Sequence, residues 1–175
     1  MRKFLMCLLA VMFVLVSGDV LAAKESKSKG KAKNKSVAKK VQAGKVAWKN
    51  NIKTAIAEAQ KSNKQILVLL TGSDWCGYCI KLDKAVFSNS NFPVLAKNMI
   101  LVKADFPRKA QTPEEKKLAN EIKMMYPASG FPTVYLLDAN GKVLDKKVGF
   151  GGGPPNSYMK SFKGYKEPKA PKKKK

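Results

Sequence analysis

Hydrophobic residues in the middle of the chain switch between the spacing of helices and the spacing of strands. Over residues 46–62 they recur every three or four positions, which predicts an amphipathic helix with Trp48 on its apolar face. The uninterrupted apolar run Ile66–Leu70 is typical of a buried central strand. Polar residues end this run, and the apolar spacing that follows predicts a helix from Cys76 to about Phe87.

The same alternation continues further along the chain. Thr112, Pro113 and Glu114 have the residue types of a helix start: a capping side chain, a proline and an acidic residue. Asn140-Gly141 between two apolar runs indicates a β-hairpin. The other predicted elements are a short helix near 91–97, the strand Met99–Ala104, a helix ending near Met125, the strands Thr133–Leu137 and Lys142–Val148, and a short helix near 156–163. This order predicts an α/β fold, a mixed central sheet with helices on both faces.

The first 23 residues have the features of a secretory signal peptide. Arg2 and Lys3 precede the apolar run Phe4–Val16, and Val20–Ala23 supplies small residues for cleavage. The apolar run is 13 residues long, shorter than the roughly 18 or more that a membrane-spanning helix needs. We therefore expect residues 1–23 to be removed on export, and the mature protein to be periplasmic or secreted.

Most of the formal net charge of +23 lies outside the predicted domain. Residues 24–45 hold nine Lys and one Glu, residues 160–175 hold eight Lys and one Glu, and neither stretch has many apolar residues. Such segments cannot bury enough apolar surface to offset the entropy of ordering them. We expect a disordered lysine-rich linker over 24–45, one domain over 46–163 and a disordered lysine-rich tail over 164–175.

Lysine-rich segments attract anionic polymers, so they bear on the expected partners. No aromatic residue is interleaved with the lysines of 24–45, and the sequence has no recognised nucleic-acid-binding motif, which argues against nucleic acid. One interpretation is that the segments are simply solvated. Another is electrostatic contact with anionic surfaces of the cell envelope, which would weaken at high salt.

The cysteine count restricts the chemistry. Once Cys7 has left with the leader, Cys76 and Cys79 are the only cysteines, and the sequence has no histidine. Two cysteines three positions apart cannot hold a fold together as a disulfide framework does. They also supply only two of the four ligands that a structural zinc site takes. We therefore expect no metal site, and redox chemistry becomes the leading interpretation of the pair.

The two cysteines belong to the segment Trp75-Cys76-Gly77-Tyr78-Cys79, which lies where the predicted buried strand passes into a helix. Amide groups at a helix start point toward the first cysteine, and the helix dipole favours negative charge there. A thiolate on Cys76 should therefore be stabilised, while Cys79 should be more buried. Gly77 is expected to keep the turn open, and Trp75 to place a flat apolar surface beside the sulfur.

In this context the chain resembles the thioredoxin family over about 46–163. The resemblance rests on the strand Ile66–Leu70 leading into Trp75–Cys79, on the downstream Gly130-Phe131-Pro132-Thr133, and on the closing hairpin at Asn140-Gly141. The stretch Thr71-Gly72-Ser73-Asp74-Trp75-Cys76 is similar to the exported thioredoxin-like branch of bacteria. The Cys-Gly-Tyr-Cys centre is also similar to that of periplasmic disulfide isomerases.

The resemblance implies a thioredoxin fold and a thiol–disulfide oxidoreductase whose redox group is the Cys76–Cys79 disulfide itself, with no other cofactor. It implies that Cys76 attacks a substrate disulfide as the nucleophile and that Cys79 resolves the mixed disulfide. It also implies a cis peptide bond before Pro132, packed against the cysteines, and a substrate-binding backbone at Phe131. The residues expected to shape the active site are Trp75, Gly77, Tyr78 and Pro132.

Two features differ from ordinary thioredoxin. Tyr78 stands where thioredoxin has proline, and changes there commonly shift the redox potential in this family. Leu69 and Leu70 stand where thioredoxin has a buried aspartate that accepts the proton of the resolving thiol, so this base is missing. Of the charged residues nearby, Asp74 would oppose thiolate formation, and Lys81 would either favour it or simply be solvated.

We therefore predict a monomeric reductase of the cell envelope that acts on protein disulfides and is recharged by a membrane electron carrier. An oxidase or isomerase would use the same chemistry, although the dimerisation domain usual in such isomerases is not visible in the sequence. A non-catalytic thioredoxin-fold protein, tethered to envelope polyanions by its tails, is the alternative from another class. A thiol peroxidase or a metal chaperone fits the Trp-Cys-x-x-Cys pair less well.

Overall fold

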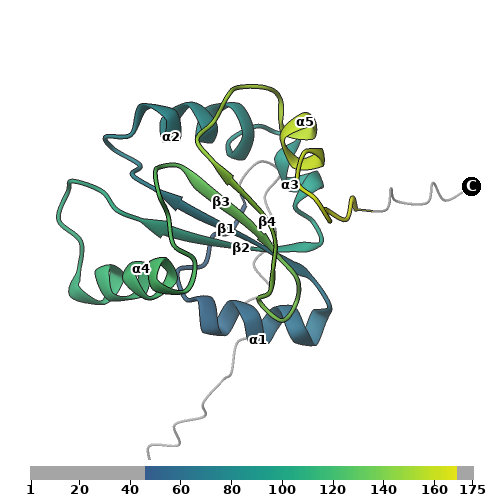
Figure 1. The fold of residues 1–175 in the computed structure, drawn as a ribbon, viewed down its shortest axis with the longest axis horizontal. Coiled ribbons are helices and arrows are strands. Elements are labelled where there is room, and N and C mark those ends of the chain that lie inside the picture. Colours follow the sequence, from purple (N-terminus) through teal and green to yellow (C-terminus); the bar gives the residue numbers. More distant parts are fainter. Residues whose placement is uncertain (1–45, 169–175) are drawn as a thin grey trace, which may run out of the picture. The chain divides into compact units, whose positions relative to one another are not determined.

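The computed structural model describes residues 46–168 (Figure 1). The elements are α1 (Ile52–Ser62), β1 (Gln65–Thr71), α2 (Gly77–Leu82), the π-helix η1 (Asp83–Phe87), α3 (Phe92–Leu95), β2 (Met99–Asp105), α4 (Pro113–Met125), β3 (Thr133–Leu137), β4 (Val143–Val148) and α5 (Pro155–Lys160). Within this part of the chain no helix is both long and apolar enough to cross a membrane. The predicted signal peptide over 1–23, the linker over 24–45 and residues 169–175 of the tail lie outside the described residues.

The strands form one mixed sheet in the order β2-β1-β3-β4. β1 pairs in parallel with β2, while β3 runs antiparallel to β1, with Thr133 opposite Leu70, and pairs with β4 as a hairpin. The carboxyl ends of β1 and β2 and the amino end of β3 therefore meet at one end of the sheet. The fold class predicted from the sequence is confirmed, and this end is where the predicted site residues gather.

Helices cover both faces of the sheet (Figure 1). Leu67 and Leu69 of β1 belong to a core cluster with side chains of α2, η1, α3 and α5, whereas the alternate residues Ile66, Val68 and Leu70 pack with side chains of α1 and α4. Every residue of β1 is buried, which explains why its sequence has no alternating polar positions. Burying one such aliphatic side chain contributes about 1.5–3 kcal/mol.

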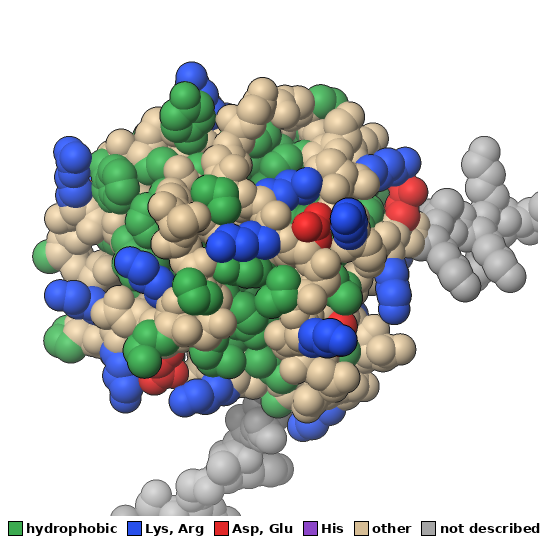
Figure 2. All heavy atoms as spheres, in the orientation of Figure 1, with side chains coloured by type: hydrophobic (Ala, Val, Ile, Leu, Met, Phe, Trp, Pro, Cys, Tyr) green, Lys and Arg blue, Asp and Glu red, His purple; other side chains and the backbone are tan. Residues whose placement is uncertain are grey.

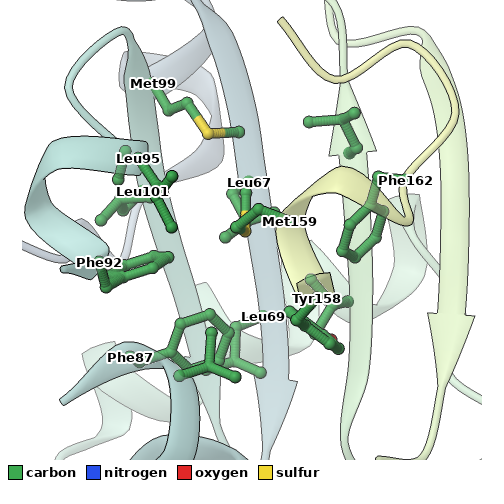
Figure 3. Close-up of a cluster of buried hydrophobic side chains, with 14 of the residues drawn as sticks. Leu67, Leu69, Phe87, Phe92, Leu95, Met99, Leu101, Tyr158, Met159 and Phe162 are labelled. Carbon is green, nitrogen blue, oxygen red and sulfur yellow. The ribbon is translucent and has the colours of Figure 1, made fainter. Parts of the chain in front are cut away.

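Aromatic side chains fill the first of these two clusters (Figure 3). The ring of Phe87, at the end of η1, meets the ring of Phe92 edge to face with centroids 5.0 Å apart, and that of Tyr158 in α5 at 6.4 Å. Leu69 lies close to both Phe87 and Tyr158 in this view. The helical segment formed by α2 and η1, which begins directly after Cys76, is thus packed against β1 through its far end.

The first helix begins later than the sequence predicts. The predicted range is 46–62, but α1 starts at Ile52. The side-chain oxygen of Asn51 accepts hydrogen bonds from the N–H groups of Lys53 at 3.0 Å and Thr54 at 3.2 Å. These bonds satisfy amides that have no partner within the helix, so Asn51 caps α1 and sets its start.

Residues before Asn51 are extended and lie beside β2. The Lys49 N–H donates to the Leu101 carbonyl, and the Lys103 N–H donates to the Lys49 carbonyl, both at 2.8 Å. The prediction that Trp48 lies on the apolar face of α1 is therefore wrong. Trp48 packs with the cluster that contains Leu67 and Phe87, on the face of the sheet opposite α1. Its ring meets Phe87 edge to face with centroids 5.2 Å apart.

The predicted helix start at Thr112 is confirmed. The Thr112 hydroxyl accepts the Glu115 N–H at 3.2 Å, and the Glu115 carboxylate accepts the Thr112 N–H at 2.9 Å, so the two residues form a capping box at the start of α4. The bond from the Thr112 N–H most of all, and a second bond that the Thr112 hydroxyl donates to the same carboxylate at 3.0 Å, lower the pKa of Glu115.

Residues 164–168, which the sequence analysis placed in a disordered tail, pack against the domain. The Tyr165 hydroxyl donates to the Leu95 carbonyl at 2.9 Å, and the Lys166 N–H donates to the Gln65 side chain at 2.9 Å. Burial raises the pKa of Tyr165 to about 12. The packed region therefore extends beyond residue 163. The lysine-rich composition did not indicate this, because the contacts come from one aromatic side chain and a few backbone groups whose partners lie far along the chain.

Candidate redox site

Cys76 and Cys79 form a disulfide where β1 leads into α2, with their Cα atoms 5.2 Å apart. Cys76 is extended and stands at the N-cap position of α2, and its sulfur accepts the Cys79 N–H at 3.2 Å. This is the contact between a helix-start amide and the first sulfur that the sequence predicted. A hydrogen bond to sulfur stabilises a thiolate more than a thiol, so it favours Cys76 as the group that ionises after reduction.

Both cysteines are largely closed to solvent, Cys76 at 7% and Cys79 at 4% exposure, so they differ little in burial. Two aromatic neighbours are more open, because Trp75 is 40% exposed and Tyr78 is 61% exposed. A partner molecule therefore meets these rings before it meets the sulfur atoms. Apolar rings that remain exposed beside a buried reactive group are typical of a surface that binds another protein.

Trp75 joins three loops at this end of the sheet. Its indole N–H donates to the Phe106 carbonyl at 2.8 Å, and its ring meets the Phe131 ring edge to face with centroids 5.9 Å apart. The Phe106 and Phe131 rings also contact each other, with centroids 5.4 Å apart. Trp75 and Phe131 were expected at the site from the sequence, but Phe106 was not, because nothing in the local sequence around residue 106 indicates these contacts.

Close packing at this turn requires a glycine at position 72, whereas the role of Gly77 in keeping the turn open stays a prediction. A Cβ atom built at Gly77 would meet nothing within 4 Å, so packing does not support the role that the sequence analysis gave it. A Cβ at Gly72 would lie 2.5 Å from Nε1 of Trp75. Gly72 thus lets the indole ring lie against the backbone. A glycine directly after a buried strand is the signal that could have indicated this close approach.

Asp74 and Asp105 join the turn before Cys76 to the segment after β2. The Asp74 carboxylate accepts the Arg108 N–H at 3.0 and 3.1 Å and the Lys109 N–H at 3.1 Å. In the other direction, Asp105 accepts the Ser73 N–H at 3.0 Å. The bonds that Asp74 accepts, the one from the Arg108 N–H most of all, hold the pKa of its carboxyl below its usual value of about 3.8. Asp74 thus has a structural role that the sequence analysis missed.

Lys81 lies beside Tyr78, with its ammonium nitrogen 5.6 Å from the centroid of the ring. This contact places Lys81 on the exposed face of the site, and both roles left open for it, favouring a thiolate or being simply solvated, stay predictions. Behind the cysteines, Leu69 and Leu70 are 3% and 0% exposed. The buried aspartate of ordinary thioredoxin therefore has no titratable counterpart at these two positions.

The peptide bond between Phe131 and Pro132 is cis. Pro132 is buried and Phe131 is half-buried, and the Pro132 carbonyl accepts the Gly149 N–H at 2.7 Å. The structure places Phe131 beside Trp75, whereas a role for its backbone in binding substrate stays a prediction. Among residues 46–168 no group of three or more His, Cys, Asp or Glu side chains gathers as a metal site would require.

The sequence matches the thioredoxin-like domain family over residues 52–160, and the chain belongs to that family. Disulfide bond reductase DsbH of Chlamydia pneumoniae is 36% identical to it over 111 residues, which cover 62% of this chain and 66% of DsbH. The aligned part is thus slightly less than two thirds of that relative. A solved structure of a DsbH oxidoreductase superposes with a TM-score of 0.61 at 28% identity, covering 82% of this chain and 91% of the other. The predicted family and fold are confirmed.

Proposed function

We propose that this protein is a thiol–disulfide oxidoreductase that reduces disulfides in other proteins. The observation that carries the proposal is the Cys76–Cys79 disulfide at the start of a helix in a thioredoxin-like domain. The similarity to a protein named as a disulfide bond reductase supports reduction as the direction. The two exposed aromatic side chains beside the cysteines favour proteins as substrates.

The proposed reaction begins with the reduced protein. The Cys76 thiolate attacks one sulfur of a substrate disulfide, forms a mixed disulfide and releases the other substrate sulfur as a thiolate, which takes up a proton. Cys79 then loses its proton and attacks the Cys76 sulfur, which releases the second substrate sulfur. Two electrons pass from the cysteine pair to the substrate, and the Cys76–Cys79 disulfide forms. One of the two protons taken up by the substrate sulfurs is the proton lost by Cys79, and the other comes from solvent and replaces the one that Cys76 released on ionising.

The surroundings of Cys79 shape the second step. Because Leu69 and Leu70 provide no base behind the cysteines, we propose that the departing substrate thiolate or water accepts the Cys79 proton. Cys76 is proposed to face the partner, since it directly follows the exposed Trp75, precedes the helix and is slightly more exposed than Cys79. The Phe131 backbone is proposed to contact the bound substrate, and Tyr78 to influence the reduction potential.

We further propose that the protein works outside the cytoplasm as a monomer. The signal-peptide pattern of residues 1–23 supports export to the periplasm or the exterior. A reductase in such an oxidising compartment needs a steady supply of electrons, so a membrane-bound dithiol carrier is the proposed donor. The lysine-rich segments 24–45 and 169–175 would add electrostatic contact with anionic envelope surfaces.

Two cysteine variants test the proposal in a dithiothreitol-driven insulin reduction assay with residues 24–175. Cys76→Ser should reduce the catalysed rate to the background given by dithiothreitol alone, because the nucleophile is gone. Cys79→Ser should accumulate mixed disulfides with substrate, visible by mass spectrometry, because nothing resolves them. Lys97→Gln, at the opposite end of the sheet, is the control that should retain activity. If both cysteine variants turn over like the parent protein, the assigned site is wrong.

The direction of electron flow is tested by the reduction potential of the pair, measured against glutathione buffers. A value near the roughly −270 mV of thioredoxin would agree with a reductase. A value between roughly −120 and −180 mV would instead favour an oxidase or isomerase. A pair that is never oxidised by these buffers would favour a tethered protein without turnover.

A further inference from the structure

Arg108 is held to the redox site through both its backbone and its side chain. Its backbone N–H donates to both carboxylate oxygens of Asp74, at 3.0 and 3.1 Å. Its guanidinium carbon lies 5.7 Å from the centroid of the Trp75 ring. Asp74 and Trp75 are the two residues that directly precede Cys76, so Arg108, which comes from the loop after β2, is held against the turn that leads into the nucleophile.

Within residues 46–168, the charge of Arg108 has no acidic side chain as its ion-pair partner. The ion pairs within residues 46–168 are Lys49–Glu58, Lys53–Glu121, Lys147–Asp145 and Lys160–Glu167, and none of them involves Arg108. Asp74, which the Arg108 backbone contacts, already accepts two backbone N–H groups, and Asp105 accepts the Ser73 N–H. Arg108 is also exposed, so its guanidinium N–H groups can reach a bound molecule.

Two further cations lie over aromatic rings of the candidate site. Lys81 has its ammonium nitrogen 5.6 Å from the Tyr78 ring centroid, and Lys123 has its own 5.4 Å from that of Phe106. Neither belongs to an ion pair within the part of the chain that the structure describes. Figure 2 shows Lys and Arg side chains spread between apolar groups over one face of the domain, with few acidic side chains among them.

We infer that the redox site prefers protein disulfides with an acidic side chain next to a cysteine, and that Arg108 binds this carboxylate. This inference rests on the proposed function. The planar guanidinium can donate two parallel N–H bonds to one carboxylate, which a lysine ammonium cannot match. Because Asp74 holds the Arg108 backbone and the guanidinium already lies over the Trp75 ring, binding costs less further ordering than it would for a side chain without these contacts. Lys81 and Lys123 add attraction at longer range, which raises the association rate.

Three peptides test the preference. Each contains one disulfide, and they differ only in the residue beside one cysteine, which is Glu, Gln or Lys. The reduced protein is mixed with each peptide, and the second-order rate of a single turnover is followed after acid quenching. Because an exposed charge pair is worth little, the Glu peptide should react only about two- to fivefold faster than the Gln peptide, and the Lys peptide more slowly than either. Salt at about 0.5 M should remove most of the difference.

Variants assign the preference to Arg108. Arg108→Gln should bring the Glu-to-Gln rate ratio close to 1, and Arg108→Lys should leave an intermediate ratio, because it keeps the charge but loses the paired N–H groups. Lys97→Gln removes a positive charge at the other end of the sheet and should leave the ratio unchanged. The ratio separates recognition from structural damage, since a general distortion slows all three peptides alike.

Each adverse outcome has one meaning. Equal rates for the three peptides would overturn the inference and leave the proposed function intact. A preference for Glu that persists in Arg108→Gln would overturn the assignment to Arg108. Failure of the reduced protein to react with any of the peptides would instead count against the proposed function.

Discussion

Aspartate side chains hold the loops at both ends of the sheet, but over very different sequence distances. At the β3–β4 hairpin, Asp138 accepts the N–H groups of Asn140 at 2.8 Å and Lys142 at 3.0 Å, both within four positions. At the redox end, Asp74 accepts the N–H of Arg108, 34 positions away. The hairpin can therefore form from local residues, whereas the redox end takes its shape only when β1 and β2 are paired.

Because of this difference, we expect substitutions at the two ends of the sheet to affect different properties: stability at the hairpin end and activity at the redox end. The hairpin end carries no group of the proposed reaction, so changes there should reduce the free energy of unfolding and spare the chemistry. The redox end consists of exposed turns held by a few polar bonds around Trp75, so changes there should affect the reaction more than the fold. Matched substitutions at the two ends test this division.

Two glycines make the first matched pair, and Gly141→Ala should have the largest effect on stability. Gly141 has φ of 83°, and a Cβ there would lie 2.9 Å from Cδ1 of Ile56 and 3.1 Å from the Tyr126 hydroxyl. Backbone strain and crowding together should lower the free energy of unfolding by about 2 kcal/mol, measured by urea titration. Insulin reduction should remain at the parental rate under conditions where the variant is folded.

Gly72→Ala is the counterpart at the redox end. The added methyl group displaces the Trp75 ring, which breaks its bond to the Phe106 carbonyl and changes the tryptophan emission. We expect a smaller loss of stability than for Gly141→Ala, since Trp75 is 40% exposed, and a larger loss of reduction rate. If Gly141→Ala were the more damaging of the two to the reaction, the division between the ends would be wrong.

The two aspartates make the second pair. Asp138→Ala removes the acceptor of two hairpin N–H groups and should cost about 1 kcal/mol in the free energy of unfolding, with little effect on insulin reduction. Asp74→Ala releases the segment that carries Arg108 from the turn before Cys76. It should lower kcat/KM for insulin by roughly tenfold, because this turn and Arg108 are no longer held in place beside the bound substrate. Equal kcat/KM values for the two variants would contradict the comparison.

The smallest predicted effect is a pH dependence. The folded state holds the pKa of Asp74 below its usual value of about 3.8, so the ionised carboxylate stabilises the fold above that pH. This contribution is lost as the pH falls through the lower, folded-state pKa. The difference in unfolding free energy between the parent protein and Asp74→Asn should therefore be constant above about pH 5 and shrink below about 3.8. Glu115 is present in both proteins, so its contribution cancels from the difference. A difference in unfolding free energy that grows as the pH falls would contradict a lowered pKa for Asp74.

The parts of the fold that the sequence predicts depend on neighbouring residues. The capping box at Thr112, the buried run of β1 and the Asn140-Gly141 turn each follow from a few consecutive positions. The same is true of the strand-to-helix passage at Cys76. For this reason the sequence alone predicts the order of the elements and the place of the cysteine pair at the start of a helix.

What the sequence did not reveal depends on contacts between distant residues. Trp48 has the spacing of a helical residue, yet pairing of Lys49 with β2 places it against Phe87. Phe106 and Arg108 lie in a stretch without regular spacing, and they join the site only because β1 and β2 end side by side. No local pattern encodes a partner more than thirty positions away.

Both outer strands of the sheet carry lysines. β4 forms one edge and contains Lys146 and Lys147, while β2 forms the other and contains Lys103, with Lys49 bridged to its neighbour Val102. A bare strand edge is a template on which a second chain can add as a further strand. Two copies that approach edge to edge bring like charges together, so the sheet resists extension from molecule to molecule into a fibril, even where many copies fold close to one another.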